Sequence, residues 1–341
     1  MLGWNDAHQQ AWVDLGAPGV PGRVSRIDRG WSRVMRHAGD DDPMRVRNLY
    51  VDVAVGDWVV PSADGERVEH IIERTSAFTR RASHEGDRFE ADVLAANVDL
   101  VYLVHALGTP PNQRRLEREL VLAYDSGAEP VVVLTKADLV PDPEPARREL
   151  AAVALGVPVL VASGRSGEGV DAIRSSASGN RTLAFLGASG VGKSTLVNAL
   201  LDSEVMDTGE IREADHRGRH TTVAAELVRL PGEGWLIDTP GVRAVSLWLS
   251  VDGIERAFSD VFDLMDHCRF RDCKHDQEPD CAVRAAIEAG TLRADRLASL
   301  ERLVAEEAAL EAEQERFVRR ADRRRERYVP ESDRSDAAEP H

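Results

Sequence analysis

The pattern of hydrophobic and polar positions changes twice along the chain. Between about Gly22 and Arg81, short stretches alternate apolar with polar residues, as in residues 22–27, 49–53, 57–60 and 67–72. Turn residues separate these stretches, and the pattern predicts about five short strands within about sixty residues. Such a run is typical of a small β-barrel, and the oligonucleotide-binding (OB) barrel is the leading candidate. A β-rich adaptor without a ligand fits the pattern equally well.

From about Ala91 the chain alternates apolar runs with longer amphipathic stretches. Residues 98–104, 130–134, 157–162 and 182–186 predict buried strands, and residues 114–124 and 146–155 predict helices between them. This alternation is typical of a mostly parallel sheet covered by helices. After about Leu247 the pattern is helical, is interrupted by a Cys/His cluster, and ends in a long charged helix over roughly 293–327.

We therefore predict an α/β multidomain protein. Its expected parts are an N-terminal extension (1–21), an OB-type barrel (22–85), an α/β domain (90–246), a helical domain around the Cys/His cluster (247–329) and a disordered polar tail (330–341). The longest apolar runs are too short to span a bilayer. The first residues lack a basic stretch followed by an apolar one, so we expect neither a secretory signal nor a membrane partner.

A glycine-rich loop with a lysine follows the last of these predicted strands. Residues 187–194 fit G-x-x-x-x-G-K-[ST] and lie between the strand 183–186 and a predicted helix over 195–201, the context that a phosphate-binding loop requires. Its backbone N–H groups would wrap nucleotide phosphates, Lys193 would reach the β- and γ-phosphates, and the Ser194 hydroxyl would bind Mg²⁺. The residues expected to contact the nucleotide are Gly187, Ala188, Ser189, Gly190, Val191, Gly192, Lys193, Ser194 and Thr195.

Two further motifs indicate GTP rather than ATP. Downstream, a short apolar strand leads into the D-x-x-G motif 238–241, in which Asp238 would belong to the Mg²⁺ shell and the Gly241 N–H would contact the γ-phosphate. Upstream, the strand 131–134 ends in Thr135-Lys136-Ala137-Asp138, which resembles the guanine-reading [NT]-K-x-D motif. A charged turn after the strand is the alternative for this four-residue match.

The guanine base presents a donor pair that adenine lacks. The Asp138 carboxylate can accept hydrogen bonds from the ring N–H and the exocyclic amine of guanine, and Lys136 can lie across the purine face. Thr135 belongs to the same loop, and Ala162 and Ser163 end the next strand, where GTPases place a loop that faces the guanine oxygen.

The order of the motifs is reversed with respect to most GTPases. Here the base-reading motif precedes the phosphate loop by about fifty residues. A circular permutation of the same sheet keeps both sets of loops at the same strand ends, so the nucleotide site survives. The D-x-x-G motif then leads directly into the C-terminal module, so a change at the γ-phosphate could be passed to an appended domain.

The polar stretch before D-x-x-G is where a switch segment belongs. Thr221 or Thr222 would complete the Mg²⁺ coordination, and an ordinary exposed loop is the alternative. Val242 follows Gly241 where many GTPases carry a water-orienting glutamine, and a hydrophobic side chain cannot orient water. We therefore expect slow intrinsic hydrolysis. The candidate catalytic residues are Lys193, Gly241 and, for orienting water, His220.

All three cysteines lie within fourteen residues, in the pattern C-x4-C-x-H-x5-C. Three thiolates and one imidazole complete a tetrahedral shell for structural zinc and leave no position open for catalysis. The candidate ligands are Cys268, Cys273, His275 and Cys281. Coincidental or redox-active cysteines are the alternative.

Charge narrows the choice of partners. The net charge of −16 opposes attraction of the whole molecule to nucleic acid or to an anionic membrane, so such contacts must come from local basic patches. Seven arginines between Arg23 and Arg47 favour an RNA-binding role for the barrel. Only three of the 43 cationic residues are lysines, and all of them (Lys136, Lys193 and Lys274) fall in the motifs above.

Together these motifs resemble the ribosome small-subunit-dependent GTPase A family (the RsgA or YjeQ type). The resemblance rests on the permuted order and on residues 187–194, GRHTT (218–222), DTPGV (238–242) and CRFRDCKHDQEPDC (268–281), and it extends from about Gly22 to Gly290. It implies an OB barrel, a circularly permuted GTPase domain and a zinc domain. By this resemblance the four candidate ligands above would hold the zinc, and His220 matches a histidine proposed to assist hydrolysis. Thr135 stands where Asn is common, so the hydrogen bonds that brace this loop are expected to differ.

The resemblance also implies a GTPase that binds the small (30S) ribosomal subunit and its 16S rRNA during late maturation and is stimulated by that subunit. We expect a cytoplasmic monomer with one structural Zn²⁺ and with Mg²⁺ bound beside GTP. A GTP-gated RNA-binding or ribosome-binding module, in which hydrolysis is incidental, is the main alternative. An ATP-dependent kinase would need an acceptor site that the sequence does not display.

Overall fold

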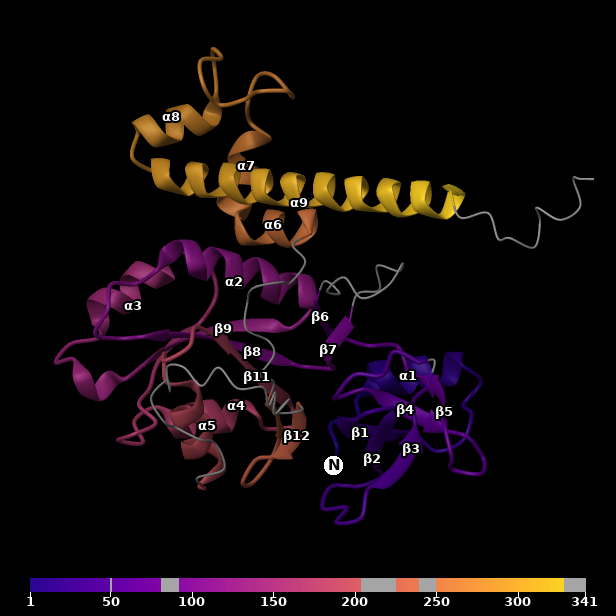
Figure 1. The fold of residues 1–341 in the computed structure, drawn as a ribbon. Coiled ribbons are helices and arrows are strands. Elements are labelled where there is room, and N and C mark those ends of the chain that lie inside the picture. The colour runs from indigo at the N-terminus through magenta and orange to yellow at the C-terminus, as the bar shows by residue number, and fades with distance from the viewer. Residues whose placement is uncertain (50, 81–91, 204–224, 239–249, 328–341) are drawn as a thin grey trace, which may run out of the picture. The chain divides into compact units, whose positions relative to one another are not determined.

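The computed structural model describes residues 1–49, 51–80, 92–203, 225–238 and 250–327 (Figure 1). The chain divides into two compact units. Of the described residues, those up to residue 257 belong to the first unit and residues 258–327 to the second. In the described residues, no helix combines the length and the apolar character that a membrane crossing demands.

The N-terminal part of the first unit contains five short strands, about the number that the alternating pattern predicts, and the predicted stretches 22–27, 57–60 and 67–72 correspond to the first, fourth and fifth of them. They are β1 (Gly22–Asp28), β2 (Trp31–Met35), β3 (Met44–Arg47), β4 (Trp58–Pro61) and β5 (Val68–Ile71), paired in the order β3-β2-β1-β4-β5. A bridge between Arg47 and Arg67 brings the two ends of this order together. The interior consists of valines, including Val24, Val34 and Val46, which are fully buried.

One predicted strand in this region is wrong. The pattern at 49–53 is not a strand, because residues 51–53 turn back on themselves, with the Val53 N–H donating to the Val51 carbonyl. The third strand is formed instead by Met44–Arg47, which alternates equally well and pairs with β2 along its whole length. The N-terminal extension carries helix α1 (Asp6–Asp14), capped by the Asn5 side chain.

The second half of the unit is a parallel sheet with helices on both faces (Figure 1). Its strands are β8 (Leu100–Ala106), β9 (Glu129–Thr135), β10 (Val159–Val161), β11 (Thr182–Gly187) and β13 (Trp235–Asp238), all parallel, in the order β10-β9-β8-β11-β13. Strand β12 (Glu226–Arg229) pairs antiparallel with β13. A separate hairpin of β6 (Ala77–Arg80) and β7 (Asp92–Ala96) precedes this sheet.

The helices of this half are α2 (Gln113–Ser126), α3 (Glu144–Ala151), α4 (Val170–Ser176), α5 (Lys193–Leu201) and α6 (Val251–Ala257). Three of them (α2, α3 and α5) correspond to the predicted stretches 114–124, 146–155 and 195–201, whereas α4 was not predicted and α6 lies in the region expected to belong to the C-terminal helical domain. Helices α4 and α5 bury Ile173, Leu196 and Leu200 against Tyr102 and Phe185 of the sheet. Helix α2 buries Leu116 and Leu120, and α6 packs against α2. The apolar runs of the sheet are therefore covered on both sides, as a parallel sheet requires.

The barrel and the parallel sheet are joined by backbone pairing, because β12 also pairs with β1. Arg23 of β1 crosses this joint fully buried, and its guanidinium donates to the Asn97 carbonyl (3.0 Å) and to the Thr182 hydroxyl (2.8 Å). Burial lowers the pKa of Arg23 to about 10, so the side chain stays charged at neutral pH. If the barrel and the parallel sheet moved apart, the buried Arg23 guanidinium would lose its hydrogen-bond acceptors and its charge would be left unsatisfied. Arg23 therefore fixes the barrel to the sheet.

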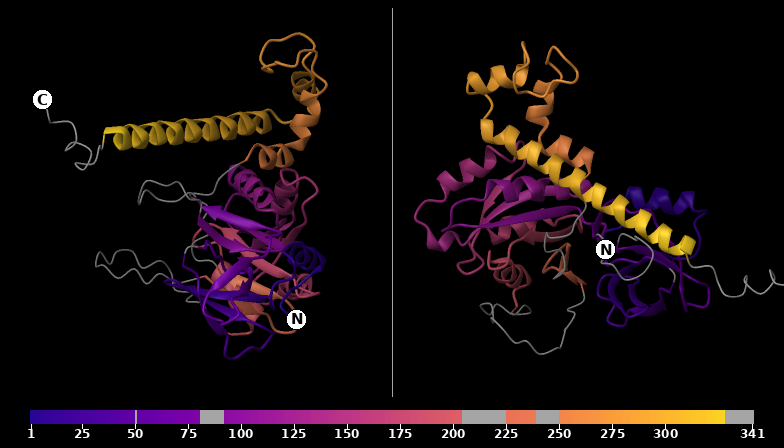
Figure 2. Two further views of the ribbon diagram at one scale, coloured as in Figure 1. Left: turned by 90° about the vertical axis from the view of Figure 1, so that its right-hand side faces the viewer. Right: turned by 45° about the horizontal axis from the view of Figure 1, so that its top comes forward.

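The second unit is helical, as predicted (Figure 2). It contains α7 (Ser259–Met265), α8 (Ala282–Glu288) and the long α9 (Ala294–Arg327). Phe258, Val261 and Leu300 are buried. Arg296 of α9 donates to the Asp260 carboxylate of α7 at 3.0 Å and lies over the Phe258 ring at 4.1 Å, which fixes α9 against α7.

Candidate functional site

The phosphate loop leaves β11 at Gly187 and ends where α5 begins at Lys193. A Cβ atom on Gly187 would lie 2.6 Å from the Val104 carbonyl oxygen, so only glycine allows the loop to turn beside β8. Gly192 has a φ of +96°, the left-handed conformation that glycine adopts without strain. These requirements explain why this segment of the sequence alternates glycine with small residues.

The Lys193 ammonium lies over its own loop. It donates to the carbonyl oxygens of Gly187 (2.8 Å) and Ala188 (2.5 Å). The side chain therefore crosses the concave side of the loop, and the N-terminus of α5 supplies the positive end of a helix dipole at the same point. Cationic and backbone donors gathered in this way suit the phosphates of a nucleotide.

The predicted base-reading motif lies directly beside the phosphate loop. The buried Thr135 hydroxyl contacts the carbonyl oxygens of Val191 in the loop and of His105 in β8 (3.2 Å). Lys136 follows with a φ of +61°, which turns the chain away from β9. These contacts place Lys136 and Asp138 at the same edge of the sheet as the phosphate loop.

Ser163 fixes the carboxylate that is predicted to read the base. Its buried hydroxyl donates to the Asp138 carboxylate at 2.6 Å and accepts the N–H groups of Arg165 and Ser166. The backbone of Ala162 accepts from the Ala137 N–H at 3.2 Å, so the loops after β9 and β10 are tied together. The structure thus brings together Thr135, Lys136, Asp138, Ala162 and Ser163, although two separate loops carry them.

The predicted switch residues, or their side chains, lie outside the part of the chain that the structure describes. Asp238 is the last residue of β13, next to the strand that carries the phosphate loop, but its side chain is outside the described part of the chain. His220, Thr221, Thr222, Gly241 and Val242 also lie outside the described residues. Their assigned roles stay predictions.

Beneath the Thr135 loop lies a buried polar network that the sequence analysis did not identify. The His105 imidazole pairs with the Glu119 carboxylate of α2 (2.9 Å), and that carboxylate also accepts from Arg115 (2.9 Å). Glu119 is fully buried. The signal in the sequence was a histidine inside the apolar run 100–106, and a helix that places Glu119 four residues after Arg115. This network holds the end of β8, whose carbonyl accepts from Thr135.

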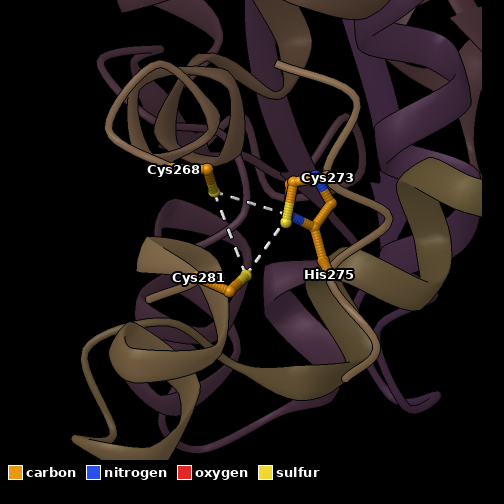
Figure 3. A group of neighbouring side chains, drawn as sticks. All are labelled: Cys268, Cys273, His275 and Cys281. Carbon is orange, nitrogen blue, oxygen red and sulfur yellow. Dashed lines mark hydrogen bonds between the residues drawn. The ribbon is translucent and has the colours of Figure 1, made fainter. Parts of the chain in front are cut away.

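In the second unit, the four predicted metal ligands converge (Figure 3). All four ligand atoms of Cys268, Cys273, His275 and Cys281 lie within 4.8 Å of one another. The sulfurs of Cys268 and Cys281 are 3.9 Å apart, and the His275 Nδ1 is 3.7 and 3.5 Å from them. Zn–S bonds of about 2.3 Å in a tetrahedron place two sulfurs about 3.8 Å apart. The spacing of the donors therefore fits one zinc ion.

Local structure holds these ligands in place. Cys281 caps the N-terminus of α8, where its sulfur accepts from the Arg284 N–H at 3.5 Å. The Glu278 carboxylate accepts the N–H groups of Lys274 and Asp276, which folds the loop around His275. Burial and the two neighbouring thiols raise the pKa of Cys273 to about 11, and a bound divalent cation would displace that proton.

Comparison with known proteins finds a matching family and relatives of the same kind. Residues 71–248 match the RsgA GTPase family. The chain is 43% identical over 320 residues to a protein of Streptomyces coelicolor named small ribosomal subunit biogenesis GTPase RsgA, covering 89% of this chain and 85% of that protein. It is 39% identical over 313 residues to a protein of the same name from Methanosarcina acetivorans, covering 89% and 84%.

The fold is also similar to solved structures. The structure of YjeQ from Thermotoga maritima aligns with a TM-score of 0.61 at 25% identity and covers 84% of this chain and 98% of that one. The structure of YloQ, described as a circularly permuted GTPase, aligns with a TM-score of 0.59 at 24% identity and covers 85% and 95%. The permuted motif order inferred from the sequence agrees with this description.

Proposed function

Because the chain belongs to the RsgA GTPase family, it is a GTP hydrolase of small-subunit biogenesis, and we propose that it acts on the 30S subunit late in maturation, stimulated by that subunit. The resemblance found in the sequence, the fold class and the activity are confirmed by the family match and the curated relatives. The kinase alternative is therefore not retained.

One observation carries the proposal for the nucleotide site. The hydroxyl of Thr135 contacts the Val191 carbonyl, so the base-reading loop and the phosphate loop form a single site although their order in the sequence is reversed. We assign guanine recognition to Asp138, with Lys136 across the purine and Ala162 and Ser163 facing the base. The phosphates would contact residues 187–195.

Mg²⁺ fits the oxygen donors at this edge of the sheet. Ser194 is the second residue of α5, and Asp238 ends β13. Hydroxyl and carboxylate oxygens are the ligands that Mg²⁺ prefers, and we assign these two residues to it together with Thr221 and Thr222. When bound, the ion would neutralise charge that develops on the phosphates.

This chain contributes binding and orientation rather than covalent chemistry. Lys193 and the backbone N–H groups of the loop would stabilise charge on the β- and γ-phosphates, and the Gly241 N–H would contact the γ-phosphate. Val242 carries no group that orients water, so intrinsic turnover should be slow. We assign the water-orienting role to His220.

We propose that the Cys/His cluster binds one structural Zn²⁺ through Cys268, Cys273, His275 and Cys281. The four donors fill a tetrahedral shell, which excludes a catalytic water. The ion would hold the loop between α7 and α8 closed, since few apolar side chains of that loop are buried.

The family suggests a ribosomal partner, and the net charge of the chain indicates which kind of surface would contact it. We propose that the barrel contacts 16S rRNA, through a local basic surface because the net charge of −16 repels a polyanion elsewhere. A ribosomal-subunit substrate places the proposed activity in the cytoplasm. We propose a monomer without a membrane partner, with GTP and GDP as its nucleotides.

The test is steady-state GTP hydrolysis by the purified protein alone, with small subunits and with large subunits. The proposal expects slow basal turnover that rises by orders of magnitude with small subunits only. Equal, slow turnover in all three samples would favour the GTP-gated binding module, in which hydrolysis is incidental. Stimulation by large subunits alone would overturn the assigned partner.

A further inference from the structure

The C-terminal end of strand β8 touches both loops of the candidate nucleotide site. Gly187, the first residue of the phosphate loop, is in register with Val104, and a Cβ atom on this glycine would lie 2.6 Å from the Val104 carbonyl oxygen. One residue further along β8, the His105 carbonyl lies 3.2 Å from the hydroxyl of Thr135 in the base-reading loop. The position of this strand end therefore bears on both loops at once.

Thr135 depends on β8 for its contact with the phosphate loop. Its hydroxyl lies within hydrogen-bond distance of the carbonyl oxygens of Val191 and His105, and a hydroxyl has one proton to donate. The Leu107 N–H also donates to the Thr135 carbonyl at 2.9 Å, which fixes the main chain of Thr135 to the same strand end. A movement of this end is therefore passed to the contact between Thr135 and Val191.

The side chain of His105 ties the strand end to helix α2, which covers this face of the sheet (Figure 1). The His105 ring is 6% exposed and lies 2.9 Å from one carboxylate oxygen of Glu119, which is fully buried. The other carboxylate oxygen accepts from Arg115 at 2.9 Å. The Arg115 side chain is 36% exposed, so the polar network runs from the surface of α2 to the end of β8.

A buried polar pair is an unusual choice at this position. Val101 and Leu103 alternate with His105 on the same face of β8, and both are buried apolar residues. Apolar residues of similar volume are often as stabilising as a buried ion pair, because such a pair loses its hydration. A buried hydrogen-bonded pair is, however, satisfied in few arrangements and so restricts geometry. A pair of this kind beneath the Thr135 loop indicates a role in the geometry of the nucleotide site.

We propose that His105 is a positioning residue of the nucleotide site. Its pair with Glu119 holds the end of β8 so that Thr135 keeps its contact with the phosphate loop, and this slows the dissociation of guanine nucleotides. The inference rests on the proposed nucleotide site and adds to it two side chains that lie in neither the base-reading nor the phosphate loop. Both act through the backbone of β8 and through Thr135.

The test measures the release of N-methylanthraniloyl-GDP, a fluorescent analogue, by stopped flow after a chase with excess GDP. The main variant, His105→Leu/Glu119→Leu, removes the pair without leaving a buried carboxylate, and the partly exposed Arg115 can then turn to solvent. His105→Gln is the conservative variant, because the glutamine amide can still donate to the Glu119 carboxylate. Thermal melting is recorded for every protein.

Tyr102→Phe is the matched control. Tyr102 belongs to the same strand, is fully buried and ties β8 to helix α4 by a hydrogen bond to the Ser176 hydroxyl at 2.6 Å. Its loss removes a buried polar tie of β8 that is remote from the Thr135 hydroxyl. The control therefore separates a general loosening of the strand from a specific effect at its end.

We expect His105→Leu/Glu119→Leu to release the analogue at least about fivefold faster than the wild type, the effect of losing about one net hydrogen bond at the site. Its melting temperature should change little, because apolar residues replace the buried pair. His105→Gln and Tyr102→Phe should each stay within about twofold of the wild-type rate. A wild-type rate in the double leucine variant would overturn the proposal, and so would equal acceleration in Tyr102→Phe.

The route through Thr135 is tested by adding Thr135→Val to the double leucine variant. If His105 acts through Thr135, the triple variant should release the analogue at the rate of Thr135→Val alone, because the contact that His105 maintains is already lost. Acceleration by the product of the separate effects would mean that His105 acts independently of Thr135, and would overturn the proposed route.

These measurements need no ribosomal subunit. If small subunits fail to stimulate a wild-type protein that binds the analogue, the proposed ribosomal function fails, and the release rates still decide the role of His105. If the wild type binds no guanine nucleotide, the proposed nucleotide site is overturned and this inference with it.

Discussion

The Thr135 hydroxyl meets the Val191 carbonyl oxygen across 56 positions of sequence and joins the end of β9 to the phosphate loop. In the chain, the base-reading motif comes first and the phosphate loop second. In the fold both follow parallel strands of one sheet, so both loops emerge at the same edge. Circular permutation changes which strands are connected and leaves this edge intact.

Replacing Thr135 by Val should weaken nucleotide binding. The substitution keeps the shape of the side chain but leaves the buried carbonyls of Val191 and His105 without this donor, which costs about 1–3 kcal/mol. We expect GDP affinity to fall by about fivefold to a hundredfold in isothermal titration calorimetry. Thr109→Val is the control, because that exposed hydroxyl bonds only its own turn. Wild-type affinity in Thr135→Val would refute the bracing role.

The carboxylate of Asp138 should determine the choice of base. In Asp138→Asn, one acceptor becomes a donor that faces the guanine N–H groups, so we expect the ratio of GTP to ATP affinity to fall by at least about tenfold. Phosphate contacts should be spared. Ser163→Ala, which removes the 2.6 Å hydrogen bond to Asp138, should lower the same ratio to a smaller extent. Competition of ATP against a fluorescent GTP analogue measures both, and an unchanged ratio in Asp138→Asn would contradict the assignment.

Features that depend on residues close in sequence could be predicted from the sequence. Features that depend on contacts between distant residues could not. The alternation of strands and helices, the phosphate loop and the Cys/His spacing were readable because each depends on residues close in sequence. The third barrel strand was misplaced because Met44–Arg47 and residues 49–53 alternate equally well, and only pairing with β2 selects the former. The fusion of barrel and sheet through β1 and β12, and the buried position of Arg23, depend on contacts that no local pattern encodes.

Removing one zinc ligand should affect the second unit selectively. Cys273→Ser leaves three donors, so we expect bound zinc, measured by mass spectrometry of the metal, to fall from one equivalent to well below half. Helical signal from α7 and α8 should decrease, and protease cleavage within residues 266–281 should accelerate. GDP binding should change little, because the nucleotide loops belong to the first unit. A folded, metal-free variant with wild-type protease resistance would argue against a structural ion.

Finally, the N-terminal helix should make the stability of the first unit depend on pH. The His8 ring is buried, its Nε2 lies 3.3 Å from the Asn97 side-chain oxygen, and its Nδ1 has no partner among the described residues. Burial and the nearby Arg23 charge lower the pKa of His8 below the usual 6.5. The unfolded chain therefore takes up a proton at a higher pH than the folded one.

The contribution of His8 to stability is thus fully present above about pH 6.5 and is lost as the pH falls toward its folded pKa, by at most about 1.4 kcal/mol per pH unit. Urea unfolding at pH 7.5, 6.5 and 5.5 measures this loss. In His8→Gln the free energy of unfolding should fall less steeply with acid than in the wild type. His37→Gln, at an exposed position, should keep the wild-type steepness. Parallel pH profiles for wild type and His8→Gln would mean that folding does not lower the pKa of His8, and would contradict this prediction.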